Sequence, residues 1–368
     1  MDHSLGVVFT GSPGVVPGYL VEELKNLFQG VGVQSHVVSQ KVFGDNVRCA
    51  DAHAYICDQV LPKEAVKALK EVYERRLLVV ALTYQDSPMH NACDFLSADL
   101  LLDDQKTLAA KRHLQRFVWL LFGHPFVTPD PQESAMMYAH VARLRSGDLS
   151  RQVGACIVDT MEQVLAVGFN EVPKAGGGFY DNTLPAEKDF RDWPWRLNSS
   201  MDAKKRIFKE ILTFLKDNKK IDIPENYFEE GPVEELLLGL KEETTFMDIL
   251  EYSRNIHAEM SALIGALNTG RSVKSATLYT TTFPCHTCTR HLVAAGIRRV
   301  CYLDPFSKSQ ALSLFSDSVT YQQVNAQDQR VLFEQFTGIT PRKYALFEAP
   351  SREDAFGHQR PWIPTLRL

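Results

Sequence analysis

Two short segments in the second half of this 368-residue chain restrict its fold more than any other feature. The first is His257-Ala258-Glu259, and the second is Pro284-Cys285-His286-Thr287-Cys288. Apolar residues at helical spacing predict one helix from about Asn255 to Leu267 and another from Pro284 to Gly296. A strand is predicted between them, from Ala276 to Thr281. Each segment therefore stands at a predicted helix start, within a βαβ-like arrangement.

The residue types in these segments are those of a zinc site. Two cysteines three residues apart in the first turn of a helix point their sulfurs the same way, and the helix dipole favours thiolates there. With one imidazole they make three ligands, which leaves a position for water, and zinc lowers the pKa of that water toward ~7. We therefore expect His257, Cys285 and Cys288 to hold Zn²⁺. Glu259 is expected to be the catalytic proton shuttle.

Two other interpretations of these residues stay open. Isolated cysteines and histidines are more often packing residues than ligands, but five matching positions in two spaced segments favour a metal site. A fourth protein ligand would close the site. His286 lies between the cysteines and should point elsewhere on the helix, whereas His291, three residues after Cys288, is the alternative fourth ligand.

The rest of the chain divides into two predicted domains. Strands and helices alternate from Gly6 to Leu82, which predicts a small parallel α/β unit. A proline-rich connection places the boundary so that residues 1–128 form one domain and 129–368 another. The second domain has a polar insertion at about 174–251. The chain has a net charge of −5, and the insertion alone contains 12 Lys+Arg and 17 Asp+Glu.

Composition excludes several classes of protein. No apolar run reaches the ~18 residues that a membrane span needs. The N-terminus, Met1-Asp2-His3-Ser4, has neither a basic nor an apolar region of an export signal. The seven cysteines are scattered and odd in number, which suits a reducing compartment. We expect a cytoplasmic protein without membrane contact, and its acidity argues against tight binding to nucleic acid.

The two segments match H-x-E and P-C-x-x-C, the pattern of the zinc nucleobase deaminases. Residues 132–320 resemble the cytidine/deoxycytidylate deaminase superfamily, which implies a three-layer α/β/α domain. Leu149 to Ala155 resembles the entry to the family's first strand, and Gly168 to Pro173 resembles its Gly-Tyr-Asn-Gly-x-Pro segment. The resemblance implies that Asn170 contacts sugar or base. Glu171 departs from the family's usual glycine.

The whole chain is most similar to bacterial anti-phage dCTP deaminases. The similar segments are Phe122 to Phe126, Leu149 to Ala155, Asn170 to Gly178 and His257 to Ser318. The resemblance implies an N-terminal P-loop-kinase-like (Rossmann-like) domain. We expect this domain to be degenerate, because Gly11 to Tyr19 lacks the lysine and the Ser/Thr of a phosphate loop. It also implies dCTP depletion in phage defence, a homo-oligomer, and inhibition by an RNA or protein regulator.

The resemblance implies hydrolytic deamination of dCTP or dCMP. Hydroxide attacks C4 of cytosine while Glu259 moves the protons, and the backbone near Ala258 orients the substrate together with Asn170. Phosphate must be bound by basic or hydroxyl side chains, for which Arg151 and the pair Lys308-Ser309 are candidates. The alternative for these charges is a solvated surface.

Three rival functions share parts of this pattern. A deaminase of single-stranded nucleic acid would use the same zinc chemistry but needs a basic, aromatic channel that the sequence lacks. A non-catalytic zinc fold used for binding or sensing would have no need of Glu259. Adenine deamination is the third rival, which the segment around Asn170 disfavours.

Overall fold

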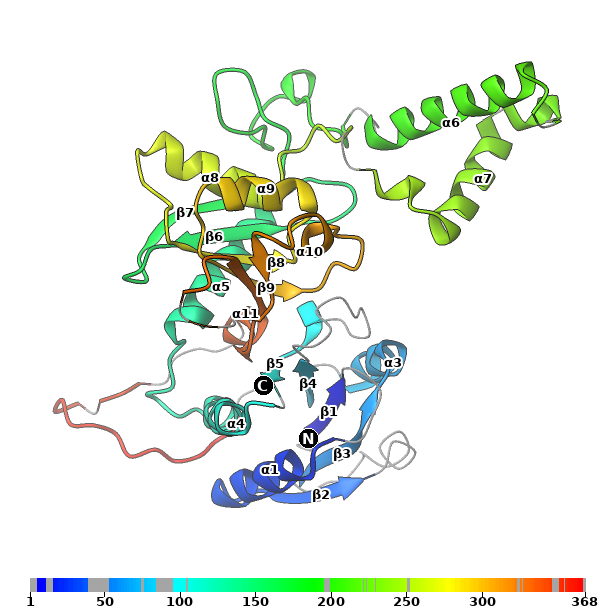
Figure 1. Ribbon diagram of the computed structural model, residues 1–368. Helices are drawn as coiled ribbons and strands as arrows, with labels where there is room; N and C mark the ends of the chain where they lie inside the picture. Colours follow the sequence, from blue (N-terminus) through cyan, green and yellow to red (C-terminus); the bar gives the residue numbers. More distant parts are fainter. Residues whose placement is uncertain are drawn as a thin grey trace.

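The computed structural model describes residues 5–10, 16–38, 53–73, 76–83, 95–103, 105–194, 199–220, 222, 224–228, 230–249, 252–322, 325, 327–345, 351–353 and 355–366. These residues form a mixed α/β fold with two six-stranded sheets, one for each half of the chain (Figure 1). The predicted loop from Gly11 to Tyr19 lies mostly outside the described residues.

The first sheet has the order β12-β5-β4-β1-β3-β2, and its first five strands along the chain are parallel. Those strands are β1 (Leu5–Thr10), β2 (Gln34–Val38), β3 (His53–Leu61), β4 (Leu77–Thr83) and β5 (Leu100–Asp103). β1 and β4 are buried along their whole length, as continuous apolar runs are when helices cover both faces of a parallel sheet. The helices of this half are α1 (Gly18–Gly30), α3 (Lys63–Tyr73) and α4 (Thr107–Leu121).

The second sheet has the order β10-β11-β9-β8-β6-β7. Its strands are β6 (Gly154–Val158), β7 (Val164–Phe169), β8 (Thr277–Thr282), β9 (Arg299–Asp304), β10 (Val319–Thr320) and β11 (Val331–Gln335). β6 is antiparallel to β7 and β8, and the other pairs are parallel. One face carries α8 (Ala258–Asn268) and α9 (His286–Ala294), with α10 (Ala311–Leu314) beyond them. The other face carries α5 (Pro131–Ala142).

One buried apolar cluster is common to the two sheets. Val8 and Val79 of the first sheet belong to the same buried cluster as Met136 of α5 and as Cys156 and Cys301 of the second sheet. The predicted boundary between residues 128 and 129 falls in the connection from α4 to α5. However, β12 (Gly338–Ile339) returns from the second half to pair with β5. The division into domains therefore remains a prediction.

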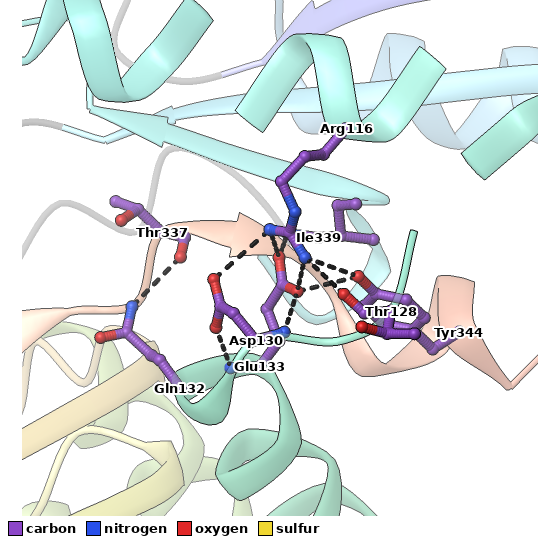
Figure 2. A network of polar contacts seen from close by, with 8 residues as sticks. All are labelled: Arg116, Thr128, Asp130, Gln132, Glu133, Thr337, Ile339 and Tyr344. Carbon is purple, nitrogen blue, oxygen red and sulfur yellow. Dashed lines mark hydrogen bonds and ion pairs between the residues drawn. The ribbon is translucent and has the colours of Figure 1, made fainter. Parts of the chain in front are cut away.

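A buried polar network ties the two halves together beside this core (Figure 2). The Glu133 carboxylate of α5 is fully buried and accepts five hydrogen bonds. Arg116 of α4 donates two of them, at 2.8 and 2.6 Å. The others come from the Asp130 and Ile339 backbone N–H groups, both at 2.9 Å, and from the Tyr344 hydroxyl at 2.8 Å. Tyr344 ends the short helix α11 (Pro341–Tyr344).

The insertion is largely helical and extends away from the second sheet (Figure 1). It contains α6 (Ser199–Asp217), α7 (Glu230–Glu243) and the short 3-10 helix η6 (Phe246–Asp248). The sequence predicts only part of α6, from Lys204 to Leu215. Among the described residues, no helix is both long and apolar enough to cross a membrane.

Candidate metal and catalytic site

The first segment lies at the start of α8, where His257 is the N-cap with an extended backbone (φ −69°, ψ 156°). The helix begins three residues later than predicted, because Ile256 pairs with Glu171 in an isolated antiparallel bridge. α8 packs closely on β7 at Gly168. A Cβ there would lie 2.3 Å from the backbone of both Ala258 and Ala262, so only glycine permits this contact.

The second segment lies at the start of α9, two residues later than predicted. Cys285 is the N-cap, and its sulfur accepts a hydrogen bond from the Cys288 backbone N–H at 3.5 Å. Both cysteines are buried. His286 and His291 do not belong to the cluster of potential metal ligands that the described residues form.

The geometry of this cluster fits zinc. His257 Nδ1 lies 3.3 Å from Cys285 Sγ and 3.4 Å from Cys288 Sγ, and all three donor atoms are within 4.8 Å of one another. A tetrahedral site with Zn–S of about 2.3 Å and Zn–N of about 2.1 Å requires N···S distances of about 3.6 Å. Both N···S distances are thus within a few tenths of an ångström of those in a zinc site.

The electrostatics of the cluster favour the thiolate form of Cys285. The hydrogen bond with Cys288, followed by that with His257, lowers the pKa of the Cys285 thiol to about 4 in spite of burial. The hydrogen bond with Cys285 raises the pKa of His257 to about 9. Near neutral pH these shifts correspond to a Cys285 thiolate paired with a protonated His257, and zinc would take the place of that proton.

Glu259 lies against this cluster and is 4% exposed. Its Oε2 is 3.5 Å from Cys288 Sγ. Burial, with the charge of Cys285 as the next cause, raises the pKa of Glu259 to about 6. A carboxyl group with a pKa near the operating pH can both accept and return a proton.

A cavity of about 770 Å³ opens onto Glu259, and its size is typical of small-molecule sites. Of the predicted residues it is lined by Arg151, Asn170, His257, Ala258, Glu259, Cys285 and Lys308. Cys288 is buried behind this wall, and the described lining does not include Ser309. The structure thus brings all but one of the predicted site residues to one place.

The Asn170 side chain is held by backbone groups at the entry to β6. Its Oδ1 accepts from the Val153 N–H at 2.7 Å, and its Nδ2 donates to the Arg151 carbonyl at 2.8 Å. These bonds fix Asn170 at the entry to β6 and leave one amide hydrogen for a ligand. The neighbouring Glu171 accepts from the Gly147 N–H at 2.7 Å, so this departure from the family pattern braces a loop of the cavity wall.

The three predicted phosphate-binding residues have different surroundings. The Arg151 guanidinium lies 5.3 Å from the centroid of the Phe306 ring and 3.9 Å from Asp304 Oδ2. Lys308 forms an ion pair with Asp248. The Ser309 hydroxyl donates to the Pro284 carbonyl at 2.7 Å, which fixes the loop before Cys285. The Ser309 hydroxyl is thus engaged within its own loop region, and Ser309 is not among the described residues that line the cavity.

Sequence reasoning missed the part of the cavity wall that the insertion supplies. It comprises Ser200, Met201, Lys204, Lys205, Glu234, Leu237, Leu238 and Met247. The Lys204-Lys205 pair at the start of an amphipathic helix was a usable signal, but nothing in the local pattern shows which surface that helix covers.

Comparisons with known proteins agree with this site. Residues 129–304 match the family model described as the cytidine and deoxycytidylate deaminase zinc-binding region. Deoxycytidylate deaminase of Enterobacteria phage T2 is 26% identical over 178 residues, which are 48% of this chain and 81% of the phage protein. Deoxycytidylate deaminase of Mus musculus is 24% identical over 171 residues, which are 46% of this chain and 63% of the mouse protein.

Among solved structures, dCMP deaminase from the cyanophage S-TIM5 in complex with dCMP and dUMP aligns with 57% of this chain and 98% of its own. The TM-score of 0.32 and the identity of 15% are too low to carry an argument. The match of residues 129–304 and the donor set described above are the findings that indicate the kind of site. Residues 129–304 are thus similar to the zinc-binding region of cytidine and deoxycytidylate deaminases, and the donor set of His257, Cys285 and Cys288 lies within them.

Proposed function

We propose that this enzyme deaminates deoxycytidine nucleotides, converting dCMP or dCTP to the uracil nucleotide with release of ammonia. The observation that carries the proposal is the buried carboxylate of Glu259, which lies beside the His-Cys-Cys donor set and opens onto a cavity of about 770 Å³. The phage and mouse relatives are deoxycytidylate deaminases, which supports this substrate class.

His257, Cys285 and Cys288 would hold the metal. Bound zinc supplies a Lewis acid that acidifies water. The Glu259 carboxylate accepts a proton from the attacking water and passes it to N3 of cytosine. It then takes the second proton from the hydroxyl group now on C4 and delivers it to the amine as the C4–N bond breaks, so that the oxygen remains as the C4 carbonyl and ammonia leaves. Burial of Glu259 keeps solvent away from these transfers.

The backbone near Ala258 and the spare amide hydrogen of Asn170 are assigned to base and sugar. Both residues line the cavity, and the two hydrogen bonds of Asn170 hold its amide in one orientation. A side chain fixed in this way loses little entropy when it binds a ligand, which favours a positioning role.

The proposal extends to the whole chain by resemblance. dCTP is the proposed substrate in the cell, and its depletion the proposed role in phage defence. Residues 1–128 are assigned to a degenerate P-loop-kinase-like domain, which the parallel order of β1 to β5 supports. Exposed apolar side chains on α5 and α8, such as Val141 and Leu267, support a homo-oligomer. Inhibition by an RNA or protein regulator remains part of the proposal.

The test is ammonia release by the zinc-loaded protein from dCTP, dCMP, deoxycytidine, CTP and a cytosine-containing oligonucleotide. We expect turnover of the deoxycytidine nucleotides and none of the oligonucleotide. Glu259→Ala should retain zinc by metal analysis and lose about 10²- to 10⁴-fold in rate, the size of a general acid–base contribution. Glu235→Ala, on an exposed position of α7, is the matched control. Wild-type turnover by Glu259→Ala would refute the assignment.

A further inference from the structure

Four basic side chains of the described residues line the cavity that leads to Glu259. Arg151 and Lys308 come from the body of the second half, and Lys204 and Lys205 come from the first turns of α6 in the insertion. The chain as a whole is acidic, with a net charge of −5. Four cations on one cavity wall are therefore a local feature and do not reflect the general surface.

The two cations of the body are both associated with the segment that follows β9. Arg151 lies over the ring of Phe306, which itself lines the cavity and precedes Lys308 by two residues. Lys308 forms an ion pair with Asp248 of η6 in the insertion. η6 is thereby held against this side of the cavity.

The first of the two insertion lysines contacts the same 3-10 helix, η6, that Lys308 contacts. Lys204 is 6% exposed and donates to the carbonyl of Met247, the neighbour of Asp248, at 2.6 Å. Lys205 forms an ion pair with Glu234 of α7. Contacts with η6 therefore connect Lys204 to Lys308, and the four basic side chains border one continuous space.

Three carboxylates of the described lining also border this space, and each has a separate task. Glu259 lies at the metal ligands, and Asp148 accepts hydrogen bonds from the backbone N–H groups of Ser150 and Arg151. Glu234 pairs with Lys205. Partly exposed ion pairs of this kind are weak, so a multiply charged phosphate chain can replace the carboxylate partners of the lysines.

We propose that Lys204 and Lys205 of α6 are phosphate-binding, specificity-determining residues, which act with Arg151 and Lys308 on the phosphate chain of the nucleotide. This inference rests on the proposed function, since it concerns the phosphate end of the same site. A phosphate monoester carries about −1.5 to −2 at neutral pH, and a triphosphate about two further charges, so four cations match a triphosphate best. Affinity should therefore fall from dCTP to dCMP to deoxycytidine.

The test compares Lys205→Gln with Lys209→Gln, a lysine one turn further along α6 that does not line this cavity. In Lys205→Gln the ratio of kcat/KM for dCTP to kcat/KM for deoxycytidine should fall about tenfold. The fall should come from a higher KM for dCTP, because one charge-assisted contact with the phosphate chain is lost. In Lys209→Gln the ratio should stay the same. Lys204→Gln is the second variant, with circular dichroism as a check because Lys204 also holds Met247.

Binding of the products dUTP and deoxyuridine, measured by calorimetry, separates this inference from the proposed function. If the wild type turns over no deoxycytidine compound while dUTP binding depends on Lys205, the function fails and the phosphate site stands. If the wild type is active but the lysine variants change the ratio no more than Lys209→Gln, the inference is overturned and the function stands. Equal losses for dCTP and deoxycytidine, or equal affinity for dCMP and dCTP, also overturn it.

Discussion

Replacing Glu133 by glutamine should weaken the joint between the two halves of the chain. The carboxylate is fully buried, and all five groups that it contacts are donors (Figure 2). An amide has one acceptor oxygen and one donor NH₂ group. Whichever way the introduced amide is oriented, its NH₂ group would face an N–H of Arg116, and the charge that balances that guanidinium would be lost.

The magnitude follows from these contacts. Breaking a buried ion pair by removing one partner costs about 3–5 kcal/mol, because the other charge stays buried. With an unfolding entropy of about 2.1 cal/mol/K per residue, a 368-residue chain that unfolds as one unit would lose about 4–6 °C in Tm. The common core of the two sheets is the reason to expect one unit.

The measurement is urea and thermal unfolding of Glu133→Gln and wild type, with Glu235→Gln on α7 as the exposed control. A loss below about 1 kcal/mol, equal to that of the control, would refute the view that this network stabilises the joint. A separate, early transition confined to one half would instead show that the two halves unfold independently.

Glu133 should also make the stability of the folded state depend on pH. Burial alone would raise the pKa of Glu133, but the hydrogen bonds from Arg116 and from the Asp130 backbone outweigh it and lower the pKa from its usual 4.5. The folded state thus binds this proton less tightly than the unfolded state. The stabilisation is fully present above pH 4.5 and is lost as the pH falls through the lowered value. Glu133→Gln should show a shallower loss of stability in acid than wild type.

Two further predictions concern the metal site. Gly168→Ala would place a Cβ 2.3 Å from the α8 backbone, so α8 must shift together with His257, the proposed metal ligand. We expect a loss of about 1–3 kcal/mol in stability and a loss of activity. Gly239→Ala, with open space around it, should be neutral or stabilising. Equal behaviour of the two glycine variants in thermal unfolding would contradict the close packing of α8. Cys285→Ser should lower the zinc content in metal analysis and lower the Tm. The wild type should reach the same Tm after its metal is removed by a chelator. Full zinc occupancy of the variant would exclude Cys285 as a ligand.

The candidate site was predictable where the chemistry is local. Cysteines at i and i+3 and a histidine at a second helix start can be recognised from spacing alone, and the structure brings those three side chains together. The helix starts themselves were placed two and three residues too early. Ile256 is extended because it pairs with Glu171, and this partner is 85 residues away in the chain.

The rest could not be predicted because it depends on packing between distant segments. Ser309 is a polar residue after a core strand, and only the fold shows that its hydroxyl is used by Pro284. The approach of Lys204 to the cavity depends on how α6 lies against η6. The pairing of Gly338–Ile339 with β5 is a two-residue contact, which is too short to have a periodic pattern.

The return of β12 to the first sheet has a consequence for synthesis on the ribosome. β5 forms the edge of the parallel strands from the moment it emerges, but its last neighbour is encoded more than two hundred residues later. At about 5–20 residues per second, this edge stays unpaired for about 10–50 s in each nascent chain. An open strand edge is a template for pairing with other chains. Polysomes that translate this protein therefore carry many copies of an exposed edge at once, and chaperone demand should peak between completion of β5 and emergence of β12.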